Sequence, residues 1–371
     1  MADRAFASEA AQRLAALYGS IEARLAGGIA GRLARGIAGS DWAERRLAEL
    51  GEVRRWAANL IGSASPAADR LARQALMDAL AHGAERARTD APGRGQVYRS
   101  DPTARTALLA NRLRGAERYA VEAAAQAYRS AVLAGGIQLT GTGDTELSRR
   151  RSVQRALNQA MESGITGFTD RAGRRWSLAG YVEMAAQTAA TQAAIDGQLG
   201  QMRADGRNLL IVSSGPQECE RCRRWMGKIL TVDSSGLGGT TVVVPSEATP
   251  ERMVTVRAAG SLAEARVAGL FHPRCRCRLG TYRVGLTGRP VTRPDPEGQK
   301  ARDRLRALER RVRELRLREA AALDDAARAE AREKRIAKQA EITAHVAASA
   351  NLGIRRDQRR ERVDIGYRAV S

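Results

Sequence analysis

Apolar residues recur along most of this chain at the three-to-four-residue spacing of a helix face. In the first stretch, residues 2–26, the series includes Leu14, Leu17, Ile21 and Leu25, which predicts an amphipathic helix. The same spacing predicts further helices over residues 41–60, 67–88 and 101–133. The sequence therefore predicts a helical N-terminal region over residues 1–140.

One apolar series within this region allows two interpretations. Ile21, Leu25, Ile29, Leu33 and Ile37 lie four residues apart, with several arginines between them. Such a segment is typical either of a membrane-active helix or of a buried contact between helices. We favour the buried contact. No stretch approaches the roughly 18 apolar residues of a membrane span, so we expect no transmembrane segment, and no secretory signal pattern is evident.

A helix, a hairpin and a second helix are predicted over residues 141–206. An apolar stripe that includes Leu157 marks the first helix, which Gly164 can end. Two short extended pieces then flank a turn at 170–173, which indicates a small hairpin. Ser177 is placed to cap the second helix, which ends just before the next apolar run.

Residues 207–288 contain the short apolar runs of β-strands. The strongest candidate is a Leu-, Ile- and Val-rich stretch at 208–213, followed by candidates at 228–232, 240–244 and 253–256. Cysteine and histidine residues flank the later strands. We therefore predict a small β-containing module whose two ends are clamped together.

A proline-rich linker, a charged helix and a basic end are predicted for residues 289–371. The helix extends from about 297 to 348, and its apolar series includes Leu305, Leu308 and Val312. The arginine-rich last twenty residues are predicted to be mobile. The whole pattern predicts a mainly α protein with a small α+β module.

Composition agrees with this fold class and adds a strong positive charge. Aromatic residues are only 4% of the chain, so aliphatic side chains have to fill the core, which suits helices more than a β-sandwich. The net charge of +21 favours contact with nucleic acid or another anionic surface. Arginine outnumbers lysine by 58 to 4, a bias that GC-rich coding also produces.

The positive charge is spread evenly along the chain. The excess of basic over acidic residues is +6 in residues 1–150, +8 in 151–289 and +7 in 290–371. A dedicated nucleic-acid arm would concentrate its charge in one block. We therefore expect DNA contacts, where they occur, to be dispersed and independent of base sequence.

All four cysteines fall within residues 219–277, and their spacing predicts a zinc site. Cys219 and Cys222 have the spacing of a zinc knuckle, and His272, Cys275 and Cys277 supply three further donors. Five candidates for four positions leave one surplus. The preferred set is the four cysteines, with His272 as a hydrogen-bond partner behind them or as a replacement for Cys277. Two disulfides and four free thiols are the alternatives, and a reducing cytosol disfavours the disulfides.

The same inventory argues against catalysis. Histidine occurs only at positions 82, 272 and 345, and His82 and His345 lie on helical patterns. A nucleophilic serine has no evident histidine partner. A catalytic zinc would need an open position beside a general base. We therefore predict a structural metal site in a protein that is not an enzyme.

Three motifs together resemble those of tailed-bacteriophage minor capsid proteins. The first extends from Gly164 to Met184 and has the sequence G-I-T-G-F-T-D-R-A-G-R-R-W-S-L-A-G-Y-V-E-M. The others are C-x-x-C-x-x-W-x-G-K, beginning at Cys219, and H-P-x-C-R-C, beginning at His272. The last motif is also similar to the head-morphogenesis proteins related to that of phage Mu. The resemblance covers about residues 145–285.

This resemblance implies a low-copy structural component of the phage head, incorporated near the portal during assembly. The implied partners are the portal protein or the major capsid protein, with an oligomer around the portal and non-specific contacts to packaged DNA. The implied locations are the virion and, during assembly, the host cytoplasm. The rival interpretation is a zinc-dependent DNA-binding or DNA-cleaving protein that acts in the host, and a membrane-active ejected protein is a more distant one.

Overall fold

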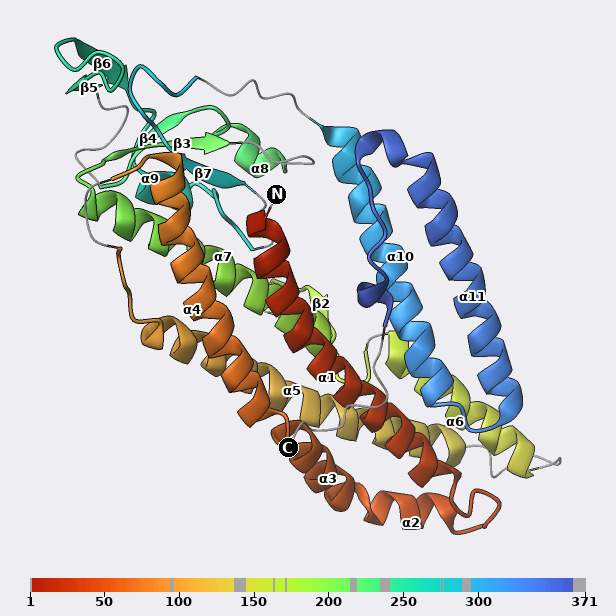
Figure 1. Cartoon of the computed structure of the whole chain (residues 1–371). Helices are drawn as coiled ribbons and strands as arrows, with labels where there is room; N and C mark the ends of the chain where they lie inside the picture. The colour runs from red at the N-terminus through yellow and green to blue at the C-terminus, as the bar shows by residue number, and fades with distance from the viewer. Residues whose placement is uncertain are drawn as a thin grey trace.

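The computed structural model describes residues 2–93, 97–136, 145–162, 164–170, 172–213, 219–233, 241–273, 275, 277–288 and 295–362. Helices make up 68% of the structure and strands 8%, so the predicted mainly α class with a small strand-containing module is confirmed. Figure 1 shows a body of long helices, with the strands β3 to β7 gathered at one end and a helical hairpin along one side.

The main body contains the helices of the first two thirds of the chain: α1 (Ala2–Ala34), α2 (Trp42–Ala48), α3 (Leu50–Gly62), α4 (Ser65–Asp90), α5 (Thr103–Gly136), α6 (Thr145–Glu162) and α7 (Leu178–Ala204). The stretch 41–60, predicted as one helix, is divided at Glu49 into α2 and α3. The Trp42 indole N–H donates to the Leu33 carbonyl over 2.9 Å and so holds α2 against the end of α1.

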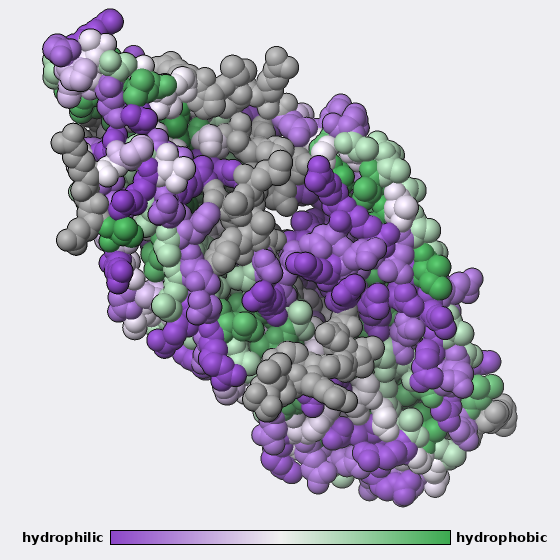
Figure 2. Space-filling view, in the orientation of Figure 1, coloured by the Kyte–Doolittle hydropathy of each residue, from purple (hydrophilic) through white to green (hydrophobic). Residues whose placement is uncertain are grey.

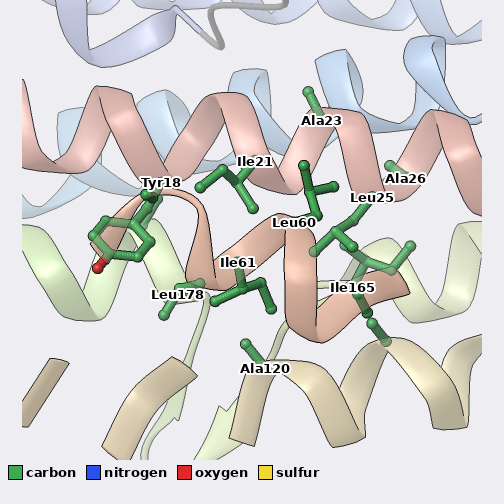
Figure 3. Close-up of a cluster of buried hydrophobic side chains, with 14 of the residues drawn as sticks. Tyr18, Ile21, Ala23, Leu25, Ala26, Leu60, Ile61, Ala120, Ile165 and Leu178 are labelled. Atoms are coloured by element: carbon green, nitrogen blue, oxygen red, sulfur yellow. The ribbon is translucent and has the colours of Figure 1, made fainter. Parts of the chain in front are cut away.

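The core of this body consists mainly of aliphatic side chains packed between α1, α3, α4, α5, α6 and α7, with Tyr18, Trp42 and Tyr128 buried among them. Tyr18 of α1 and Ile61 of α3 are among its buried side chains (Figure 3). Leu25, Ile29 and Leu33 are fully buried, so the apolar series in α1 is a buried helix contact, as predicted. Among the described residues, no helix is both long enough and apolar enough to span a membrane.

Helices α4 and α7 approach each other closely at two glycines. A Cβ atom on Gly83 would overlap the backbone of Ala194, and one on Gly197 would overlap the backbone of Leu80. The two helices are therefore in backbone contact, which only glycine permits at these positions. Because α7 also packs against α1 and α5, it is the central helix of the body.

A small hairpin links α6 to α7. Its strands, β1 (Phe168–Thr169) and β2 (Arg175–Trp176), pair antiparallel. The Asp170 carboxylate accepts hydrogen bonds from the Trp176 indole (2.9 Å) and from backbone amides of the turn, and these bonds lower the pKa of Asp170 to about 2. Ser177 then caps α7 by accepting from the Gly180 amide, as predicted.

The module that carries the cysteines is built on a three-stranded antiparallel sheet. Its strands lie in the order β4 (Ile229–Thr231), β3 (Leu209–Ser213) and β7 (Arg278–Thr281). Two further strands, β5 (Thr241–Pro245) and β6 (Met253–Arg257), form a separate hairpin. The short helices α8 (Glu220–Arg223) and α9 (Leu262–Val267) complete the module. The pattern predicted β3, β4, β5 and β6 but missed β7.

The charged segment after the linker forms two helices, α10 (Pro296–Ala320) and α11 (Asp325–Ala348), which lie side by side (Figure 1). The chain turns between them because Ala321 and Leu323 are buried against the main core and Asp324 starts a new helix by accepting from the Ala327 amide. The leucine series gives way to alanine beyond Leu323, and because alanine favours helix the sequence did not reveal the turn. A small apolar core joins the pair: Leu305, Leu308, Val312, Ile342 and Ile354.

The arginine-rich end is packed as far as residue 362, so the prediction that it is mobile is wrong for this part. A 3-10 helix, η3 (Gln358–Glu361), lies against α10. Buried Glu361 accepts from Arg356 (2.6 Å) and from Gln339 (3.0 Å), and Arg360 forms an ion pair with Glu183 of α7. The residues after 362 lie outside the described part of the chain.

Glu22 of α1 is a carboxyl group in the protein interior. It accepts hydrogen bonds from the Thr166 hydroxyl and from the Leu178 amide (2.9 Å), and so connects α1 to the start of α7. Burial raises the pKa of Glu22, although these hydrogen bonds and the charge of Arg313 oppose the rise.

We predict that alanine at either glycine of the α4–α7 crossing destabilises the protein. Gly83→Ala and Gly197→Ala should each lower the free energy of unfolding by at least about 2 kcal/mol, because the new methyl group overlaps backbone. Gly115→Ala is the matched control, since a Cβ at this position in α5 meets nothing within 4 Å and alanine favours helix by about 1 kcal/mol. Urea unfolding measures all three, and equal midpoints would contradict the close crossing.

We also predict a pH-dependent effect of Glu22→Gln. A carboxyl with a raised pKa stabilises the fold at low pH, and this contribution is lost as pH rises through the raised pKa. Glutamine keeps an acceptor for Thr166 and Leu178 but carries no charge. The stability of Glu22→Gln relative to the parent should therefore be higher at pH 8 than at pH 5 in urea unfolding. If the stability of Glu22→Gln relative to the parent decreases from pH 5 to pH 8, Glu22 is not held in a desolvated site.

Candidate metal centre

The three-stranded sheet brings the two halves of the cysteine cluster together. The end of central strand β3 pairs with β7 at Ser213 and Arg278, directly after Cys277. On its other side, β3 pairs with β4, and the Gly227 amide donates to the Val212 carbonyl. The segments that contain Cys222 and Cys277 therefore lie beside the same end of β3.

A short helical turn positions the first two cysteines. Cys219 has an extended backbone and precedes α8 as its N-cap residue. Its carbonyl accepts from the amides of Cys222 (3.2 Å) and Arg223 (3.1 Å). This turn places both sulfur atoms on the side that faces the second half of the cluster.

The second half is shaped by an unusual backbone conformation before His272. Phe271 is buried and has a φ of +59°, in the left-handed region that residues other than glycine rarely adopt. Its carbonyl accepts from the Gln192 side chain of α7. A turn follows in which the Cys275 amide donates to the His272 carbonyl over 2.9 Å. Phe271 thus redirects the chain so that His272 and Cys275 face the α8 turn.

All five residues predicted as donors lie together in the structure. Their ligand atoms form two groups that share Cys222: Cys219, Cys222 and His272 in one, and Cys222, Cys275 and Cys277 in the other. Within each group the atoms lie within 4.8 Å of one another. The sulfur atoms of Cys222 and Cys275 are 3.4 Å apart, and none of the four cysteines is in a disulfide.

The hydrogen bonding of His272 indicates which ring nitrogen faces the sulfurs. Nδ1 lies 2.8 Å from the Pro273 carbonyl, which can only accept, so Nδ1 carries the proton. In the neutral ring, Nε2 then presents a lone pair, and it lies 2.8 Å from the Cys219 sulfur. Histidines that bind metals usually donate their second ring N–H to a carbonyl or carboxylate in this way.

Burial makes it costly to ionise the cysteine thiols of the cluster. Cys222, Cys275 and Cys277 are all buried. A hydrogen bond from Cys222 lowers the pKa of Cys275 to about 3. The contact with Cys275 raises the pKa of Cys222, and the contact with Cys222 raises that of Cys277. The protein groups alone therefore favour one thiolate, whereas a soft cation would allow several.

The donor set fits a soft or borderline divalent metal. It offers sulfur and imidazole nitrogen, which suit zinc and related ions. In a tetrahedral zinc site the sulfurs would be about 3.8 Å apart, given zinc–sulfur bonds of about 2.3 Å. The 3.4 Å separation of Cys222 and Cys275 is close to this value. The buried cluster could therefore hold a metal ion.

Residues outside the predicted set support the centre. Gln192 and Gln198 of α7 donate to the carbonyls of Phe271 and Leu279, and so attach the module to the central helix of the body. Trp225 packs against the same apolar cluster as the cysteines, between Arg224 and Lys228. The spacing C-x-x-C-x-x-W pointed to Trp225, but no sequence signal indicated the glutamines of α7.

Comparison with known proteins agrees with the motifs. The sequence profile of a family described as Phage minor capsid protein 2 matches residues 3–347 of the chain. No curated protein and no protein of solved structure gives a significant match. Because the family profile covers nearly the whole chain, from α1 to the end of α11, this protein belongs to the family of phage minor capsid proteins described as Phage minor capsid protein 2.

Proposed function

We propose that the protein is a structural component of a tailed-phage head that is incorporated near the portal, where it contacts the portal protein, the shell or the packaged DNA. The observation that carries this proposal is the family match over residues 3–347. Assembly takes place in the host cytoplasm, and the finished protein resides in the virion. A position near the portal is consistent with a low copy number and with an oligomer around the portal axis.

In this proposal zinc ties the two ends of the module together. The ligands are Cys219, Cys222, His272 and Cys275, which is the set in which His272 replaces Cys277. The tautomer of His272 supports this choice, because Nδ1 is occupied by the Pro273 carbonyl and Nε2 faces Cys219. The Cys277 amide donates to the Cys275 sulfur over 3.4 Å, a contact that stabilises a metal-bound thiolate. The metal is structural, and the protein is not an enzyme.

DNA contact in this role is electrostatic. The net charge of +21 is distributed over all parts of the chain, so phosphate contacts would be independent of base sequence. Such contacts weaken as salt is raised because counterions are released on binding.

The virion itself provides the test of this role. Quantitative mass spectrometry of purified phage particles should find the chain at a few to tens of copies per particle. A protein that acts in the host would be absent from the particles, and this absence, together with nicking of plasmid DNA by the purified chain and a divalent metal, would favour the DNA-cleaving alternative. The major capsid protein provides the internal standard for copy number.

Native mass spectrometry tests the metal centre. The full chain, purified without chelators, should carry one zinc ion. Cys222→Ser should lose the ion, because Cys222 belongs to both groups of donors. His272→Gln should also lose it, whereas Cys277→Ser, the matched control in the same cluster, should keep it.

Thermal unfolding provides a second measure of the same centre. Removal of the ion by a chelator should lower the midpoint of the parent and of Cys277→Ser, since an ion that binds only the folded state stabilises it. Four free thiols or two disulfides in the purified chain, with no metal bound, would contradict the proposed centre.

A further inference from the structure

A second feature of the molecule, separate from the metal centre, is a cavity of about 1000 Å³. It lies between α1, the start of α7, α10 and η3. The β1–β2 hairpin contributes Arg175 and Trp176 to its wall. The cavity therefore brings together the hairpin motif, the charged helix and the arginine-rich end, three parts of the chain to which the proposed function assigns no task.

The wall of the cavity is strongly basic, with nine arginines and five glutamates. The glutamates are already engaged with other groups. Glu183 pairs with Arg360, Glu314 with Arg311, and Glu162 with Arg318. Glu9 pairs with Arg13, and Glu22 accepts hydrogen bonds in the interior. The protein thus has no spare carboxylate in this wall to balance the remaining arginines.

Five arginines of the wall have no carboxylate within 4.0 Å among the described residues. Arg313 donates to the Arg360 carbonyl, and the other four are Arg310, Arg316, Arg359 and Arg362. Arg310 and Arg316 lie six residues apart on α10, and Arg359 and Arg362 lie on or beside η3. The Nε of Arg316 is buried and makes no hydrogen bond to the described part of the chain. A buried donor without a partner costs on the order of 1–3 kcal/mol, so the Arg316 guanidinium is not saturated by protein partners.

The size of the cavity limits what can enter. A sphere of this volume is about 12 Å across, which is about the width of the DNA major groove alone, so a double helix is too wide. A linear polyphosphate or a short single strand is narrow enough. Arginine is the side chain best suited to such a ligand, because its planar guanidinium binds phosphate oxygens in pairs. Figure 2 shows that hydrophilic residues also dominate the visible surface over α10, next to this region.

We propose that this cavity binds a ligand that carries two or more phosphate groups, held by Arg310 and Arg316 from one wall and by Arg359 and Arg362 from the other. The ligand is either a free polyphosphate or the backbone of a short single strand, which share this chemistry. The proposal concerns the isolated chain and does not depend on where the protein lies in a virion.

Isothermal titration calorimetry on the full chain tests the site, with inorganic tripolyphosphate as the probe. We expect saturable binding that weakens as salt is raised. The double variant Arg310→Gln/Arg316→Gln should lose at least tenfold in affinity. The matched control is Arg112→Gln/Arg118→Gln, which removes the same charge at the same spacing from exposed positions on α5 and should bind as the parent does.

A second pair of changes tests the opposite wall. Arg359→Gln/Arg362→Gln should weaken binding to a similar degree, and circular dichroism will establish that each variant is folded. A five-nucleotide oligothymidylate and a twelve-base-pair duplex distinguish the sources. Tight binding of the single strand with the same arginine dependence assigns a nucleic-acid backbone, and binding of tripolyphosphate alone assigns a free polyphosphate.

Three results would overturn the proposal. The first is that neither tripolyphosphate nor the oligothymidylate shows saturable binding. The second is an equal loss of affinity in the α10 and α5 double variants, which would indicate attraction to net charge alone. The third is a duplex that competes for the same arginines, which would place the contact on the outer surface.

Discussion

Buried sulfur atoms that touch one another cannot all be ionised unless a cation lies among them, and the arrangement of the module depends on this constraint. Cys222, Cys275 and Cys277 are buried and within 4.8 Å of one another. They come from two segments with 52 residues between them, and the pairing of β3 with its two neighbours brings these segments together. A single metal ion would neutralise the thiolates and would also join the two ends of the module.

Contacts in the rest of the structure attach this module to the long helices of the body. Gln192 and Gln198 connect it to α7, and α7 is in backbone contact with α4 through Gly83 and Gly197. The α10–α11 pair is attached to the same body through buried Ala321 and Leu323. The module and the α10–α11 pair are therefore both attached to the same helical body.

Much of this arrangement could be predicted from sequence, and the exceptions have identifiable causes. The helices α1, α4, α5 and α7 follow from apolar spacing. The five candidate donors, which the structure brings together, were found from the cysteine and histidine spacing. The turn at Leu323 was missed because the alanine-rich residues beyond it also favour helix. The close crossing at Gly83 was missed because a glycine in a helical pattern does not indicate which helix packs against it. The arrangement of charged side chains around Arg316 depends on contacts between segments that are distant in the sequence. The packing of the chain near Glu361 depends on such contacts too, and no local sequence pattern predicts them.

The central claim is that a metal ion holds the two ends of the module as a structural element of a minor capsid protein. X-ray absorption at the zinc edge, recorded on the purified full chain, tests this claim most directly. The account predicts zinc with three sulfur neighbours at about 2.3 Å and one nitrogen neighbour at about 2.0 Å. A protein without zinc, or a zinc ion surrounded only by oxygen and nitrogen, would contradict it.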